Sequence, residues 1–149
     1  SNLPRGISDT IPAITVISIR VMGTLADYDR LVEECHRSGI RIVLDLVLNH
    51  FSDLHPWFEE SKQDRNNPKQ DWYVWVDPKE DGSVPNNWLS LFGGKAWTIK
   101  EVRGQYYMHS FLKEQPNLNW YNPKVRKELA KVVRFKPPLR PNLQFRLQN

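Results

Sequence analysis

The feature that most constrains this 149-residue chain is an apolar run that ends in a polar cluster. Apolar side chains fill nearly every position of residues 40–48 instead of alternating with polar ones. That pattern predicts a parallel strand covered on both faces. Asp45, Asn49 and His50 lie within and at the carboxyl end of the run, where α/β folds place binding groups. An ordinary strand-to-loop junction, with Asn and His as turn residues, is the alternative interpretation.

A helix is predicted directly before this strand, over residues 24–38. Thr24 can cap its amino end together with Asp27, and Gly39 can provide the left-handed stop. A helix, a glycine turn and a buried strand make one αβ step of a parallel sheet. The apolar residues that recur at helical spacing are Leu25, Tyr28, Leu31, Val32 and Cys35.

The stretch of residues 51–120 shows weak periodicity but holds all six tryptophans. Residues 72–76 and 105–109 are the strands that its composition favours. A structureless segment of this length is unusual in a compact domain, so we expect a small α+β subdomain held by aromatic packing. A second helix should begin at Asn122 and Pro123 and end at Phe135, before a run of prolines.

Charge and composition exclude several classes of protein. The formal net charge is +4, but the residues after Glu128 include five basic and no acidic side chains, so the basic character belongs to the tail. The remainder therefore lacks the charge pattern of a nucleic-acid binder. No apolar run reaches membrane-span length, residues 1–5 do not resemble a secretory signal, and Cys35 has no cysteine partner. We expect a cytoplasmic protein that binds neither nucleic acid nor membrane.

Residues 45–50 (DLVLNH) with residues 52–58 (SDLHPWF) resemble the first conserved region of the α-amylase superfamily of glycoside hydrolases. Within it, the likeness is greatest to the α-glucosidase and oligo-1,6-glucosidase branch. It spans residues 23–135 and continues in the family's order through PNNW at 85–88, FGG at 92–94, AW at 96–97, GQYYMH at 104–109 and EQPNLNW at 114–120.

The resemblance implies an α/β fold: a partial (β/α)8 TIM barrel around strand 3 and helices 2 and 3, with an inserted aromatic-rich α+β loop domain. A complete barrel needs about 250 residues, so we expect a truncated fragment. The implied division is 1–23 atypical N-terminal segment, 24–50 barrel helix and strand 3, 51–120 loop domain, 121–135 barrel helix 3, and 136–149 non-family basic, proline-rich tail.

Both ends depart from the family. Residues 10–22 resemble a family-like stretch translated after the loss of one nucleotide, so we hypothesise a frame-shifted segment. In the tail, residues 145–148 (FRLQ) echo the family's Gly-Phe-Arg-x-Asp, but Gln148 stands where the nucleophilic Asp would be, and three prolines argue against a central strand before it.

A retaining glycosidase needs a nucleophilic carboxylate and an acid/base carboxyl group. By resemblance these follow later barrel strands, so we predict no catalytic residue, no cofactor and no metal in this chain. Asp45, Asn49, His50, Asp53 and His55 form an alternative metal cluster, but calcium needs six to eight oxygen ligands. The substrate-binding residues that the resemblance implies are His50, Asn49, Asp45, Gln115 and Asn119; Asn117 replaces the family's usual Asp.

We therefore expect a fragment of a retaining α-glucosidase that acts on α-1,4- or α-1,6-linked short oligosaccharides and is inactive by itself. Its partner would be a small oligosaccharide or a glucose-series ligand, and an exposed strand edge would favour non-specific self-association. A sucrose isomerase or trehalose synthase type of fragment and a non-catalytic carbohydrate-binding piece remain alternatives. A nucleic-acid binder that uses the basic tail would show salt-dependent affinity.

Overall fold

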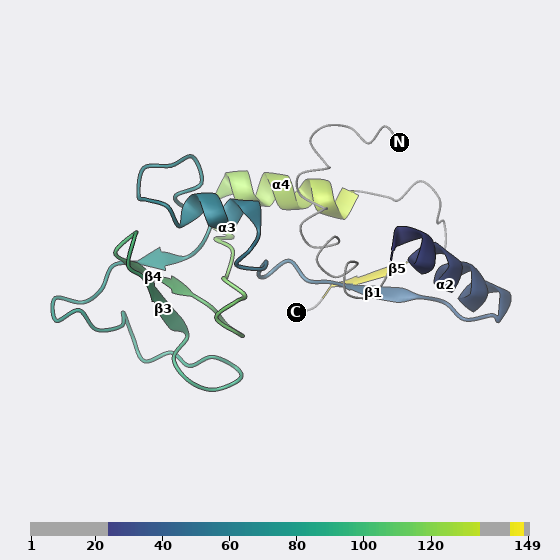
Figure 1. The fold of residues 1–149 in the computed structure, drawn as a ribbon, viewed down its shortest axis with the longest axis horizontal. Helices are drawn as coiled ribbons and strands as arrows, with labels where there is room; N and C mark the ends of the chain where they lie inside the picture. The colour runs from purple at the N-terminus through teal and green to yellow at the C-terminus, as the bar shows by residue number, and fades with distance from the viewer. Residues whose placement is uncertain (1–23, 135–143, 148–149) are drawn as a thin grey trace. The chain divides into compact units, whose positions relative to one another are not determined.

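The computed structural model describes residues 24–134 and 144–147 (Figure 1). The chain divides into two compact units. The first contains helix α2 (Leu25–Arg37) and strands β1 (Val43–Leu46) and β5 (Gln144–Leu147), and the second is Asn49–Leu129. The hypothesis of a frame-shifted segment at residues 10–22 and the proline run after residue 135 lie outside the described residues.

Helix α2 confirms the predicted capping. The Thr24 side chain accepts a hydrogen bond from the Asp27 backbone, and the Asp27 carboxylate accepts one from the Thr24 backbone N–H at 2.8 Å. Gly39 has a φ of +72°, a conformation that glycine adopts without the clash a Cβ would cause. Local chemistry alone therefore sets both ends of this helix.

Strand β1 is shorter than the predicted strand of residues 40–48. It pairs in parallel with β5, with Val43 opposite Gln144 and Leu46 opposite Leu147. The parallel pairing agrees with the sequence analysis. The prediction that both faces of this strand are covered was wrong, because Ile40 is 55% and Val43 51% exposed. The sequence analysis did not predict a strand in the tail, because it took the three prolines at 137, 138 and 141 as an argument against one. Strand β5 begins after these prolines and is not interrupted by them.

The second unit is built on a three-stranded antiparallel sheet of order β2-β4-β3 (Figure 1). Strand β4 (Gln105–Met108) was predicted almost to its ends, and β2 (Trp75–Val76) is only the last part of the predicted 72–76 strand. Strand β3 (Trp97–Lys100) was not predicted. Four residues close the β3–β4 turn, with Gly104 at a φ of +66°.

Helix α3 (Pro56–Ser61) was also missed by the sequence analysis. Proline occupies its first turn, and the His55 ring nitrogen Nδ1 caps the helix by accepting from the Trp57 backbone N–H at 3.1 Å. The short helix buries Trp57, Phe58 and Ser61.

Aromatic side chains form the core of the second unit, as predicted. Phe58, fully buried, lies 4.9 Å from Tyr73 and 5.1 Å from Tyr107, measured between ring centroids. Trp57 and Trp72 meet edge-on at 4.5 Å. Such pairs add about 0.5–1.5 kcal/mol each beyond the area they bury. Trp88 and Trp120 are different, since they are 54% and 42% exposed.

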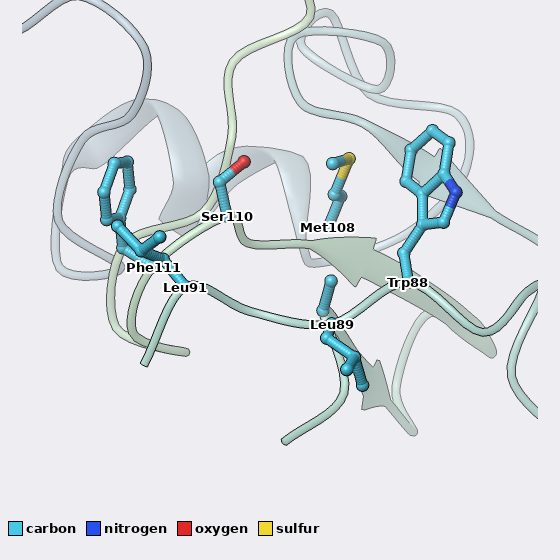
Figure 2. Close-up of a pocket in the computed structure, with 7 residues that line it drawn as sticks. Trp88, Leu89, Leu91, Met108, Ser110 and Phe111 are labelled. Carbon is cyan, nitrogen blue, oxygen red and sulfur yellow. The ribbon is translucent and has the colours of Figure 1, made fainter. Parts of the chain in front are cut away.

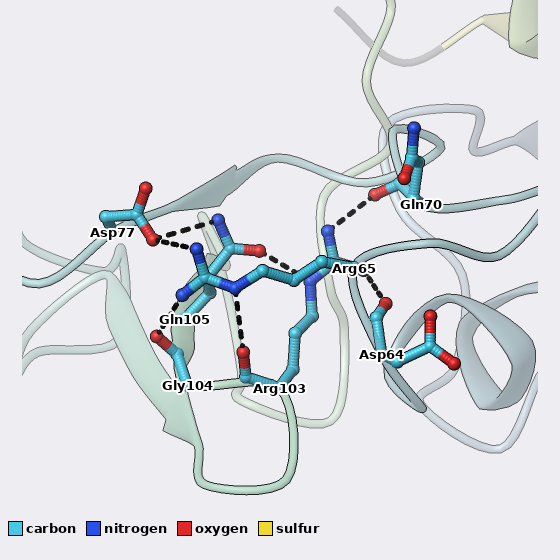
Figure 3. A network of polar contacts seen from close by, with 7 residues as sticks. All are labelled: Asp64, Arg65, Gln70, Asp77, Arg103, Gly104 and Gln105. Carbon is cyan, nitrogen blue, oxygen red and sulfur yellow. Dashed lines mark hydrogen bonds and ion pairs between the residues drawn. The ribbon is translucent and has the colours of Figure 1, made fainter.

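A buried guanidinium ties the loops to this sheet (Figure 3). Arg103 is 6% exposed, and its guanidinium stacks on the Trp75 ring at 4.4 Å from the centroid. It also donates to Gln105 Oε1 at 2.6 Å and to three backbone carbonyl oxygens, those of Ser61, Asp64 and Gln70. Arg65 extends the network by donating to the Arg103 and Gly104 carbonyls and pairing with Asp77 at 2.8 Å.

Helix α4 (Pro123–Arg134) confirms the second predicted helix. The Asn122 side chain accepts from the Lys124 backbone N–H at 2.9 Å, ahead of a proline at the first helical position. Val125 and Leu129, four residues apart, are its buried residues. Within the ranges that the structure describes, no helix is both long enough and apolar enough to span a membrane.

The Arg103 network predicts a large loss of stability in Arg103→Met. The substitution keeps an apolar chain beside Trp75 but removes the guanidinium donor from three carbonyl oxygens, of which those of Ser61 and Asp64 keep only the Asn67 amide, at a cost of about 3 kcal/mol. The free energy of unfolding should be measured by urea denaturation with tryptophan fluorescence.

The matched control is Arg126→Met. Arg126 also donates to two carbonyl oxygens, those of Trp120 and Tyr121, but it lies on an exposed surface, so its loss should cost less than about 1 kcal/mol. Equal losses in the two variants would contradict a special role for the buried guanidinium.

Candidate functional site

Three of the predicted substrate-binding residues meet at one place in the second unit. His50 forms an antiparallel bridge with Asn117, and the Leu118 backbone N–H donates to the Asn49 carbonyl at 3.0 Å. The chain after Leu48 is therefore paired with the chain after Gln115. Pairing of two segments this far apart in sequence brings side chains together that no local pattern connects.

Gln115 reaches the imidazole of His50 directly. The distance between Gln115 Nε2 and His50 Nε2 is 3.0 Å, across 65 residues of sequence. The other end of the Gln115 amide, Oε1, accepts from the Leu112 backbone N–H at 3.1 Å, and the Gln115 backbone N–H donates to the Leu112 carbonyl at 2.9 Å. Gln115 thus closes a tight turn and contacts His50 with the same side chain.

The Asn117 side chain connects the two ends of this turn through hydrogen bonds to Ser110. Its side chain is 7% exposed; Oδ1 accepts from the Ser110 backbone N–H at 2.9 Å, and Nδ2 donates to Ser110 Oγ at 2.6 Å. Its backbone donates to the Met108 carbonyl and accepts from the Val74 N–H. Buried polar groups need such partners, so Asn117 is satisfied as an amide.

His50 is half-buried, and its environment favours the neutral imidazole. Burial lowers the pKa of His50 below 6.5, because a charged ring loses solvation there. Asn49 Nδ2 lies 3.4 Å from His50 Nδ1, and the Phe111 ring centroid lies 5.1 Å from that of His50. The ring is therefore set between an aromatic face and two amides.

The other two predicted binding residues, Asn119 and Asp45, have different partners. Asn119 donates through Nδ2 to the Asp71 carbonyl at 2.9 Å and accepts through Oδ1 from the Tyr121 N–H at 3.1 Å, so its amide holds two backbone segments. Asp45 is an exposed residue of β1 in the first unit, opposite Arg146 in the strand register.

The alternative metal cluster finds no support in the second unit's geometry. His55 Nδ1 caps helix α3, and the Asp53 backbone is paired with the Glu114 carbonyl. Among residues 24–134 and 144–147, no group of three His, Cys, Asp or Glu side chains lies close enough to hold a metal ion.

The sequence analysis did not identify an apolar pocket that includes Phe111 in its wall (Figure 2). The ring centroid of Phe111 lies 5.1 Å from that of His50. The volume of the pocket is about 410 Å³, in the range of small-molecule sites. No sequence period marks it, because its walls come from three separate loops and strands. The lining residues are Trp88, Leu89, Leu91, Ala96, Met108, Ser110 and Phe111.

Comparison with known proteins identifies the class. Residues 17–137 match the alpha amylase catalytic domain family. The "Probable alpha-glucosidase" of Rhizobium meliloti (strain 1021) is 56% identical over 115 residues, 77% of this chain and 21% of the relative. The oligo-1,6-glucosidase of Heyndrickxia coagulans is 54% identical over 116 residues, 78% of this chain and 21% of the relative.

A solved structure is also similar to this chain in fold and in sequence. A variant of isomaltulose synthase from Erwinia rhapontici NX5, in complex with its natural substrate sucrose, matches with a TM-score of 0.75 and 46% identity, over 85% of this chain and 22% of that one. The chain thus spans about a fifth of the length of these relatives.

The chain therefore belongs to the α-amylase superfamily of glycoside hydrolases, whose catalytic domain is a (β/α)8 barrel. Within that superfamily it falls in the branch of the α-glucosidases and oligo-1,6-glucosidases. The predicted family and branch are confirmed.

The lowered pKa of His50 predicts a pH-dependent stability. The unfolded His50 ring, with a pKa near 6.5, binds its proton more tightly than the folded ring. The contribution of His50 to the free energy of unfolding is therefore complete above about pH 6.5 and is lost as the pH falls through the lower folded pKa. The difference in free energy of unfolding between the native chain and His50→Gln should therefore change in favour of the variant below pH 6.5.

Urea denaturation of both proteins at several pH values measures this difference, and the carboxylates that titrate in both proteins cancel. A difference that stays constant across this range would show that the folded and unfolded His50 rings bind protons equally well.

Proposed function

We propose that this chain is part of a retaining α-glucosidase that acts on α-1,4- and α-1,6-linked short oligosaccharides. The observation that carries the proposal is the contact of His50 with Gln115 at 3.0 Å, in a chain that is 56% and 54% identical to relatives called α-glucosidase and oligo-1,6-glucosidase. A half-buried, neutral imidazole beside an amide provides directed donors and acceptors for sugar hydroxyls.

In this proposal the architecture is one segment of the family's barrel. Strand β1 is the third barrel strand, α2 and α4 are the helices on either side of it in sequence, and most of Asn49–Leu129 is the inserted loop domain. The order of these elements along the chain, and the parallel pairing of β1, support the assignment.

The residues of this segment bind and orient a sugar, and they do not cleave it. Retaining hydrolysis needs two carboxyl groups about 5–5.5 Å apart. The family's nucleophile position has its only echo at Gln148, and an amide cannot form or release a glycosyl ester. Binding without these groups leaves the barrier to bond cleavage in place, because holding the ground state does not stabilise the transition state.

A sucrose isomerase type of enzyme is the second candidate. The structural similarity to isomaltulose synthase, crystallised with sucrose, favours it. Both classes begin from a bound glucosyl unit, and the same histidine and amide would serve either.

A cytoplasmic location is also proposed, on the ground that the sequence holds a single cysteine, Cys35.

A chimeric enzyme tests the parent activity. Residues 24–134 would replace the matching segment of the Heyndrickxia coagulans oligo-1,6-glucosidase, to which the chain is 54% identical over 116 residues. We expect the chimera to hydrolyse a chromogenic α-glucoside and His50→Ala within it to lose at least about tenfold in kcat/KM. His36→Ala, on helix α2, is the matched control and should keep the activity.

The 149-residue chain alone should release no chromophore above a buffer blank. Activity that persists through purification would mean that the chain carries catalytic carboxylates of its own. A folded chimera in which His50→Ala leaves kcat/KM unchanged would remove His50 from the sugar site.

A further inference from the structure

Only one of the two amides beside His50 can be a true donor to the neutral ring. A neutral imidazole has one accepting nitrogen and one N–H. Gln115 Nε2 lies 3.0 Å from His50 Nε2, and Asn49 Nδ2 lies 3.4 Å from His50 Nδ1. Two amide N–H groups that face a ring with a single lone pair cannot both be satisfied.

The Leu112 backbone decides between them. Its N–H can only donate, and it points at Gln115 Oε1 over 3.1 Å. Turning the Gln115 amide over would set two N–H groups against each other at that contact. The amide orientation is thus determined within the turn, and the Gln115 N–H group faces His50 Nε2.

We propose that Gln115 is a positioning residue that keeps the hydrogen of His50 on Nδ1 and leaves Nε2 as the accepting nitrogen. The Asn49 amide then turns its oxygen toward the Nδ1–H, which satisfies both sides of the ring. Protonation of Nε2 would place N–H against N–H at the shorter contact, so the network disfavours the imidazolium for a reason separate from burial.

The tautomer has a consequence for recognition, which rests on the proposed function. While the Asn49 oxygen keeps the hydrogen on Nδ1, a sugar hydroxyl that replaces the Gln115 amide at His50 Nε2 must donate its own hydrogen to the ring. The class of ligand is then a sugar with a free hydroxyl as donor at that position.

The direct test is the ¹⁵N NMR spectrum of the imidazole ring in the ¹⁵N-labelled 149-residue chain at mildly alkaline pH. We expect Nε2 to show the high shift of a bare nitrogen and Nδ1 the low shift of an N–H nitrogen. The reverse pattern, or the averaged shifts of a ring that exchanges between tautomers, would overturn the proposal.

Two substitutions separate positioning from simple packing. Gln115→Met keeps the side-chain length but removes the N–H, and should shift the ring toward the Nε2–H tautomer that free histidine prefers in water. Gln115→Glu offers an acceptor and should place a hydrogen on Nε2. Gln63→Met, at an exposed glutamine of the same unit, is the control and should leave the ring shifts unchanged. Folded variants that keep the wild-type pattern would refute the role of Gln115.

A last arm distinguishes this inference from the proposed function. Glucose and its monofluorinated derivatives would be titrated while the His50 ring shifts are followed. Since fluorine cannot donate, one derivative should lose the perturbation that glucose causes. If no sugar perturbs His50, the proposed function fails while the tautomer assignment stands. If every derivative acts as glucose does, the donor requirement is wrong.

Discussion

The site depends on the burial of one amide, that of Asn117. A polar side chain that is 7% exposed must find partners inside the protein, and Asn117 finds them on Ser110, with backbone bonds to Val74 and Met108. These bonds hold the end of β4 against the segment that follows it. The turn between them must then close over a short span, which brings Gln115 to the imidazole of His50. The position of the His50 imidazole therefore depends on the hydrogen bonds of the buried Asn117 amide, the residue with which His50 forms a β-bridge.

Those parts of the fold that rest on local chemistry could be predicted from the sequence. Thr24 and Asp27 cap each other across three residues, and Asn122 precedes a proline whose φ already suits a helix, so both long helices were correct nearly to the residue. Strand β4 was predicted because two adjacent tyrosines, aromatic residues that strands favour, lie there. The continuous apolar run correctly predicted that β1 pairs in parallel. It did not predict how much of the strand is exposed, because burial depends on segments far away in sequence.

The remainder could not be predicted because non-local partners determine it. Helix α3 is six residues long, too short for periodicity to reveal, and forms because His55 caps it and Phe58 enters an aromatic core. Arg103 looks like an ordinary surface residue in a turn until three distant carbonyls surround it (Figure 3). The sequence motifs named His50 and Gln115 as a set by resemblance, but only the three-dimensional fold reveals which atoms of the two side chains meet.

Asn117 also explains how a departure from the family pattern is accommodated. The resemblance places Asp at this position, and a carboxylate could accept from both the Ser110 N–H and the Ser110 hydroxyl. Asn accepts the first and donates to the second, at 2.9 and 2.6 Å, so the geometry of the turn is kept. What changes is the Ser110 hydroxyl, which now receives a hydrogen and keeps its own to donate. Because Ser110 lines the apolar pocket (Figure 2), the exchange alters the polarity of that pocket, while the contact of Gln115 with His50 is left intact.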